Sequence, residues 1–124
     1  MSFLQRVKRA LGLGATVIPE LVEDPSSLEW PEGWGPVPAA QGRALIRELR
    51  REMPAGHRLR GLPVYPLGHG EHPDELLFQI EDPDYKFARV HLTWSKERDP
   101  QWPWTTLYRT FEDFVTKERA VEES

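Results

Sequence analysis

YKFARVHLTWSKERDPQWPWTTLYRTFEDF, residues 85–114, carries the clearest structural pattern in the chain. Apolar and polar residues alternate over 86–94, which is the period of a half-buried strand. A charged loop with a proline follows, then a Trp-Pro-Trp turn at 102–104, and then the apolar spacing of an amphipathic helix. A central strand and the helix that follows it are therefore expected to organise the fold.

The chain has 124 residues, which suits one domain with its own core. It contains no cysteine, which excludes a disulfide framework, thiolate metal sites and a cysteine nucleophile. We expect no cofactor, because no glycine-rich phosphate loop is present. The net charge of −4 argues against nucleic acid as a partner. Residues 1–60 carry nine Lys/Arg and seven Asp/Glu, whereas 61–124 carry seven and thirteen. One half thus suits an acidic partner and the other a basic one.

Residues 1–14 form a predicted amphipathic cationic helix, with Phe3, Leu4, Val7 and Leu11 at helical spacing. One hypothesis is weak contact with a membrane surface through these four side chains. The other is that the apolar stripe docks on the protein's own core or on a second subunit, or frays. The chain lacks a secretory signal and an apolar run of bilayer length, so we predict a cytoplasmic protein.

Residues 15–40 are rich in proline, glycine and acid, and neither helical nor strand periodicity is present. We expect an extended arm. Trp30 and Trp34 are costly to leave in water, so the arm should wrap the domain, its own or a neighbour's, and bury them. The alternative is that these tryptophans are exposed platforms for a partner protein or a sugar.

Residues 41–119 form the predicted folded domain. Its first helix spans 41–53, where Leu45, Leu49 and Met53 share one stripe and Pro54 ends the helix. Arginines occupy the other faces. They indicate a solvated surface more often than a phosphate or nucleic-acid site.

Three strands are predicted over 62–67, 75–81 and 86–94, joined by short connections as an antiparallel meander. Two prolines place the first strand at an edge of the sheet. A final helix begins near Thr110, whose hydroxyl caps it, and residues 120–124 should fray. The predicted fold class is α+β: a helix, a three-stranded antiparallel meander and a C-terminal helix, with an extended N-terminal arm.

Histidines provide the candidates for chemistry. His69 and His72, with acidic neighbours, are weak candidates for a metal site, and a glycine-containing hairpin loop, which we favour, explains them without a metal. His91 shares a strand face with Arg89 and Thr93 and is a weak candidate for a general base. A strand histidine is more often structural.

The tryptophans of the 102–104 turn have two interpretations. Trp102 and Trp104 either form a hydrophobic plug at the end of the sheet, which we favour, or present an aromatic surface.

Four short motifs resemble a group of small bacterial proteins. They are HLTWS (91–95), WPWTTLY (102–108), FEDF (111–114) and MPAGHRL (53–59), so the resemblance covers about residues 45–114. No activity is assigned to that group. The resemblance implies a bacterial source and transfers no function.

By elimination, we expect a non-enzymatic cytoplasmic interaction or accessory protein of the inhibitor or immunity type, acting on a protein partner. Its predicted binding residues are Arg89, His91, Thr93, Trp30, Trp34, Trp102 and Trp104. The alternatives are a small hydrolase or small-ligand-binding protein with a cleft near His91, and a peripheral membrane protein attached through residues 1–14.

Overall fold

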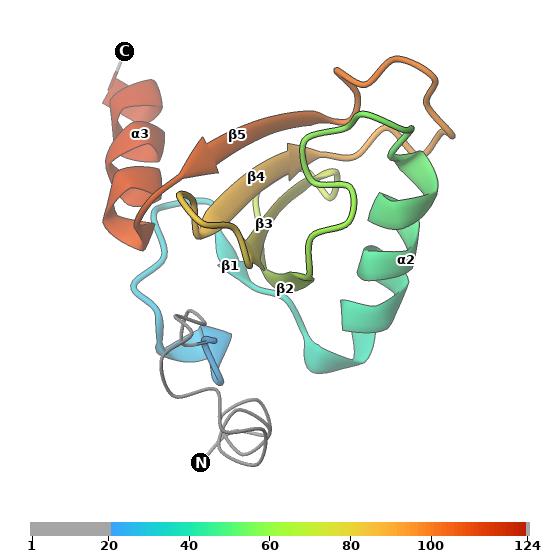
Figure 1. Ribbon diagram of the computed structural model, residues 1–124. Helices are drawn as coiled ribbons and strands as arrows, with labels where there is room; N and C mark the ends of the chain where they lie inside the picture. Colours follow the sequence, from blue (N-terminus) through green and yellow to red (C-terminus); the bar gives the residue numbers. More distant parts are fainter. Residues whose placement is uncertain (1–20, 124) are drawn as a thin grey trace, which may run out of the picture.

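The computed structural model describes residues 21–123 (Figure 1). Two α-helices, five strands and two short 3-10 helices make up this part of the chain. In order they are η1 (Pro25–Ser27), β1 (Gly35–Pro36), η2 (Ala39–Gln41), α2 (Gly42–Glu52), β2 (Val64–His69), β3 (Glu75–Ile80), β4 (Phe87–His91), β5 (Trp104–Tyr108) and α3 (Phe111–Glu123). The helix expected over 1–14 lies outside the described residues.

The strands form a single five-stranded sheet in the order β1-β2-β3-β4-β5, and every neighbouring pair is antiparallel. The prediction of a three-stranded meander with an extended arm is therefore wrong, although the antiparallel connectivity of its three strands is correct. Strands β1 and β5 were missed. β1 is two residues long and contains a proline, and β5 reads WTTLY, so neither shows the alternation by which a strand is recognised.

Strand β2 also differs from the prediction, which placed it at an edge because of its prolines. It pairs with β3 along its length, and β1 pairs only with its last two residues, Gly68 and His69. The register between β2 and β3 shifts between Pro66 and Gly68. The proline thus lies at an irregularity, where a missing N–H costs least.

The sheet is covered on both faces (Figure 1). On one face, Leu49 of α2 and Met53, which follows the helix, pack on alternate residues of the central strands, including Phe78 and Val90. On the other, the segment before β1 and helix α3 pack on residues of the opposite parity, among them Leu77. Strand β3 is consequently buried on both sides.

The helix boundaries follow local sequence signals. Thr110 caps α3 as predicted, because its Oγ1 accepts the Asp113 N–H at 3.0 Å. Helix α2 ends at Glu52, one residue before the predicted end, and Met53, which precedes Pro54, is its extended C-cap. Helix α3 continues to Glu123, past the position at which fraying was expected.

Candidate functional site

The connection between β4 and β5 displays three tryptophans. We call residues 92–104 the tryptophan loop. The side chains of Trp94, Trp102 and Trp104 are 49%, 40% and 51% exposed. Among the large hydrophobic residues of the described chain, only Val121 is also exposed. The interpretation of Trp102 and Trp104 as a buried plug is therefore wrong: Pro103 between them is buried, and the two rings face outward, 6.1 Å apart.

A buried carboxylate holds the start of this loop. Glu52, the last residue of α2, is 0% exposed. Its Oε1 accepts the Thr93 N–H at 2.8 Å and the Thr93 hydroxyl at 3.1 Å, and its Oε2 accepts the Trp94 N–H at 2.9 Å. The main-chain carbonyl of Glu52 accepts the Glu97 N–H at 3.2 Å. One residue thus attaches the loop to the end of α2 through four hydrogen bonds.

Burial, followed by the hydrogen bond with Glu48, raises the pKa of Glu52 to about 7, although the donors on Thr93 and Trp94 act in the opposite direction. The same hydrogen bond lowers the pKa of Glu48, which also pairs with Arg51 at 3.0 Å. The two carboxyl groups therefore share one proton up to near-neutral pH.

A buried histidine holds the end of the loop. Nδ1 of His57 accepts the Leu59 N–H at 3.1 Å, so Nε2 carries the hydrogen and donates it to the Pro103 carbonyl at 2.9 Å. The Thr105 hydroxyl donates to the same carbonyl at 3.0 Å. This arrangement fixes the main chain between Trp102 and Trp104.

Trp94 adopts a backbone conformation that is rare for a non-glycine residue, with φ of 58°. Its indole Nε1 donates to Asp74 Oδ1 at 2.5 Å, and its main-chain N–H is held by Glu52. Such conformations persist where the surroundings impose them, and they concentrate at functional sites.

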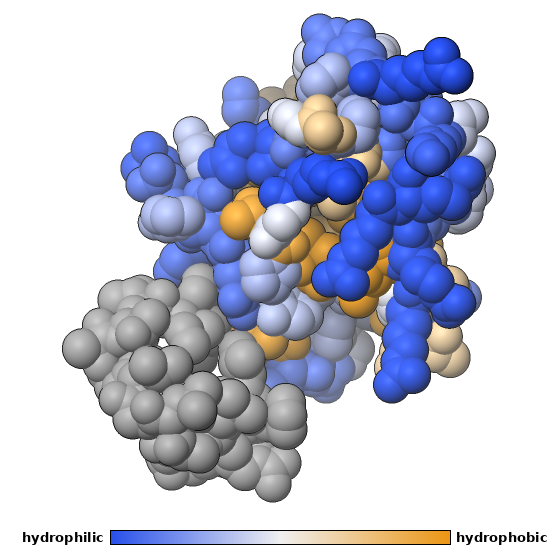
Figure 2. Space-filling model, turned by 45° about the vertical axis from the view of Figure 1, so that its right-hand side comes forward, coloured by the Kyte–Doolittle hydropathy of each residue, from blue (hydrophilic) through white to orange (hydrophobic). Residues whose placement is uncertain are grey.

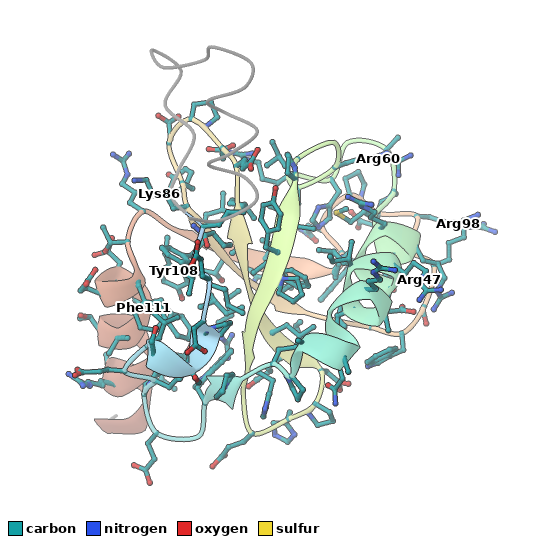
Figure 3. All side chains as sticks on the ribbon, turned by 90° about the horizontal axis from the view of Figure 1, so that it is seen from below. Arg47, Arg60, Lys86, Arg98, Tyr108 and Phe111 are labelled. Carbon is teal, nitrogen blue, oxygen red and sulfur yellow. The ribbon has the colours of Figure 1, made fainter. Side chains whose placement is uncertain are left out.

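The helix that anchors the loop is strongly basic. Arg43, Arg47 and Arg50 are exposed and make no ion pair with any described residue. Figure 3 shows Arg47 on α2 and Arg98 of the tryptophan loop directed away from the sheet on this side of the molecule.

Apolar surface is accessible between these charged side chains. Figure 2, which turns the α2 side forward, shows it between strongly hydrophilic groups. A shallow cavity of about 510 Å³ lies at the end of α2, lined by Arg50, Met53, Arg60, Gly61, Leu62 and Pro63.

Two of the three strand residues proposed for binding have structural roles. The guanidinium of Arg89 lies 3.3 Å from Glu75 and 2.8 Å from Glu118, and it stacks over Trp34 at 5.6 Å. The 2.8 Å contact is an ion pair only, because the buried Nε makes no hydrogen bond. Thr93 belongs to the Glu52 cluster. His91 is exposed and is paired in register with Glu75 and Trp104.

The two tryptophans of the arm are docked, as its composition led us to expect. Trp30 Nε1 donates to the Pro25 carbonyl at 2.9 Å, and its ring meets Phe111 edge-on at 5.3 Å. Trp34 meets Phe114 in the same way at 4.9 Å. They are part of the apolar layer beneath α3 and not exposed platforms.

The other predicted sites receive no support from the described residues. His69 and His72 are exposed, and within residues 21–123 no group of three or more His, Asp or Glu side chains is placed to hold a metal ion. The proposed membrane contacts Phe3, Leu4, Val7 and Leu11 lie outside the described residues. None of the helices in the described part is both long and apolar enough to cross a membrane.

Sequence reasoning missed the three residues that organise the site. Glu52 falls on the apolar stripe of its helix, three residues after Leu49, and a carboxylate there was a usable signal. The neighbouring sequence indicates neither the anchoring role of His57 nor the exposure of Trp94.

No protein-family model matches the chain, and no curated protein or solved structure is significantly similar to it.

Proposed function

We propose that this chain is a non-enzymatic cytoplasmic interaction or accessory protein that holds a partner protein on its tryptophan loop. The observation that carries the proposal is the exposure of Trp94, Trp102 and Trp104 on one loop whose two ends are fixed by buried polar side chains. Tryptophan is enriched among the residues that dominate protein interfaces, where it supplies a large contact area.

The loop is held by buried polar side chains, and burying them has a cost in free energy. This cost favours a function for the surface that the loop presents. Burying a carboxyl group and an imidazole is unfavourable unless they are hydrogen-bonded. Both Glu52 and His57 bond to this loop, and the second ring nitrogen of His57 accepts the Leu59 N–H. A loop held in this way loses little conformational entropy on binding. The tryptophan loop is thus preorganised for binding.

The charge around the loop favours an acidic partner surface. The arginines of α2 and Arg98 form a basic border on the side to which the loop is anchored. Cations at the rim of an interface accelerate association with an acidic partner, while buried aromatic contacts hold the complex. An inhibitor or immunity protein, which must recognise one partner tightly, fits this arrangement.

A hydrolytic site at His91 is a weaker proposal. His91 is accessible, but the neighbouring carboxylate of Glu75 is already paired with Arg89. Three cavities formed by residues 21–123 are lined by other residues. A base without a free partner or a pocket does not define a catalytic site.

Quantitative affinity capture tests the proposal. Bait proteins are the full chain, a Trp94→Ala/Trp102→Ala double variant and a Lys86→Ala control that changes an exposed residue elsewhere. We expect at least one host protein to be captured by the full chain and the control and to be depleted about tenfold or more with the double variant, as loss of an interface hot spot predicts.

Each bait must first show an unchanged thermal unfolding transition. Identical sets of captured proteins for the folded double variant and the full chain would contradict the proposal.

A further inference from the structure

The two edges of the sheet are built differently. At one edge, β1 is only two residues long and contains Pro36. At the other, β5 presents five residues, WTTLY, with neither a proline nor a charge. Natural sheets protect exposed edges with short strands, prolines or charged side chains. Strand β1 is protected in this sense, and β5 is not (Figure 1).

The hydrogen-bond pattern identifies which backbone groups of β5 point outward. The residues that flank β4 show that even-numbered positions bond towards β3, since the Lys86 carbonyl accepts the Ile80 N–H and the Leu92 N–H donates to the Asp74 carbonyl. The exception is the Lys86 N–H, which donates to the Tyr108 carbonyl of β5. The odd-numbered residues of β4 therefore bond to β5, where their partners are Trp104, Thr106 and Tyr108. The N–H and C=O groups of Thr105 and Leu107 consequently face away from the sheet.

These outward groups have no hydrogen-bond partner among residues 21–123. The edge of β5 therefore offers two unpaired N–H donors and two unpaired C=O acceptors. Such an edge accepts a further strand of suitable register.

The residues of β5 are arranged almost symmetrically about Thr106. An aromatic residue lies two positions to either side, Trp104 and Tyr108, on the same face of the strand. We propose that two copies of this chain pair through the outer edges of β5, antiparallel and centred on Thr106, to form a continuous sheet. This proposal goes beyond the proposed function and does not depend on it.

The symmetric register satisfies every outward group. Thr105 of each copy lies opposite Leu107 of the other, so four hydrogen bonds use the two donors and two acceptors of both edges. Trp104 of one copy lies across from Tyr108 of the other; Tyr108 is buried against Phe114, so the exposed Trp104 ring supplies the side-chain contact between the two strands on this face. The absence of charge in β5 leaves this pairing free of repulsion. Trp104 then belongs to the paired strands, and Trp94 and Trp102 lie outside them.

Sedimentation velocity on the full chain and on two charge variants tests the pairing. Thr106 lies opposite itself across the twofold axis, so the Thr106→Glu variant brings two carboxylates together and Thr106→Lys brings two ammonium groups together. We expect a dimer for the unaltered chain at about 100 µM and a dissociation constant raised roughly fivefold to tenfold in each variant. An equimolar mixture of the two variants should recover the dimer, because opposite charges then meet.

Hydrogen exchange on the unaltered chain gives an independent measurement that does not rely on the variants folding. The amides of Thr105 and Leu107 should exchange more slowly as the protein concentration rises, whereas the Thr106 amide, bonded within the sheet, should not change. A monomer at about 100 µM overturns the proposal. Unchanged dissociation constants in both folded variants, a mixture that dimerises no more tightly than either variant alone, or concentration-independent exchange at Thr105 and Leu107 also overturn it.

Discussion

Five tryptophans divide into two groups with opposite roles. Trp30 and Trp34, which precede the sheet, lie edge-on against Phe111 and Phe114 and complete the apolar layer under α3. Trp94, Trp102 and Trp104, on the loop after β4, are about half exposed. The same residue type stabilises the fold in one region and forms an open surface in the other.

The difference lies in what holds each group. The first pair is held by apolar contacts, and Gly68 of β2 makes room for it, since a Cβ there would overlap the Trp30 ring. The loop of the second group is held through its main chain by Glu52 and His57, and the Trp94 ring also donates to Asp74, while all three indoles stay partly exposed. The first group is thus fixed by packing of its rings and the second by polar contacts of its loop.

Removing a docked tryptophan should have the largest effect. The Trp30→Ala substitution deletes a ring packed on Phe111 and Phe114, and should lower the free energy of unfolding by about 3 kcal/mol. Urea denaturation followed by circular dichroism measures this loss. The companion Gly68→Ala variant should also destabilise the protein, because it displaces the same ring. A loss below about 1 kcal/mol for Trp30→Ala would place this tryptophan with the exposed group.

The Glu52 anchor should make stability depend on pH. The pKa of Glu52 is raised in the folded protein from its ordinary value of 4.5 to about 7. The folded state therefore holds a proton that the unfolded state has lost, so the contribution is complete below pH 4.5 and disappears as the pH rises through about 7. We expect this contribution to be about 2 kcal/mol, allowing for the opposite shift at Glu48.

The Glu52→Gln variant isolates this contribution. It cannot ionise, so the difference in unfolding free energy between the unaltered chain and the variant should fall as the pH rises from 4.5 to above 7. Exposed Glu112, substituted by Gln, is the matched control and should show no such trend. If the difference in unfolding free energy between the unaltered chain and Glu52→Gln did not depend on pH, the shared proton would not contribute to the stability of the loop.

The His57 anchor should contribute somewhat less. A His57→Phe substitution keeps an aromatic ring at this position and removes the hydrogen bonds to Pro103 and Leu59, which should cost about 1 to 2 kcal/mol. The expected signature is local: faster hydrogen exchange in the tryptophan loop, with little change in β3. Uniformly faster exchange across the whole sheet would show that His57 supports the core in general and not the loop.

The features that were predicted correctly depend on local sequence signals, whereas those that were missed depend on long-range contacts. The apolar stripe of α2 before Pro54, the alternation in β4 and the Thr110 cap are set within a few neighbouring residues, and the structure contains all three. β1 exists only because it pairs with Gly68 and His69, more than 30 residues away. Likewise, Glu52 meets Thr93 and His57 meets Pro103 across separations of 41 and 46 residues. No periodicity encodes such contacts, so the site was missed while its helices were found.

Truncating an exposed tryptophan should have the smallest effect on stability. Trp102 is 40% exposed and its ring contacts Trp104, so the Trp102→Ala variant should change the free energy of unfolding by no more than about 0.5 kcal/mol. The main chain at Pro103 stays bonded to His57 and Thr105, which keeps the loop in place. Denaturation and partner capture, measured on the same preparation, then separate the two groups. The Trp102→Ala variant should capture less partner and keep its free energy of unfolding. The Trp30→Ala variant should instead show a lower free energy of unfolding. If Trp102→Ala instead unfolded as readily as Trp30→Ala, exposure would no longer distinguish surface from core in this molecule, and the tryptophan loop would have to be regarded as part of the fold.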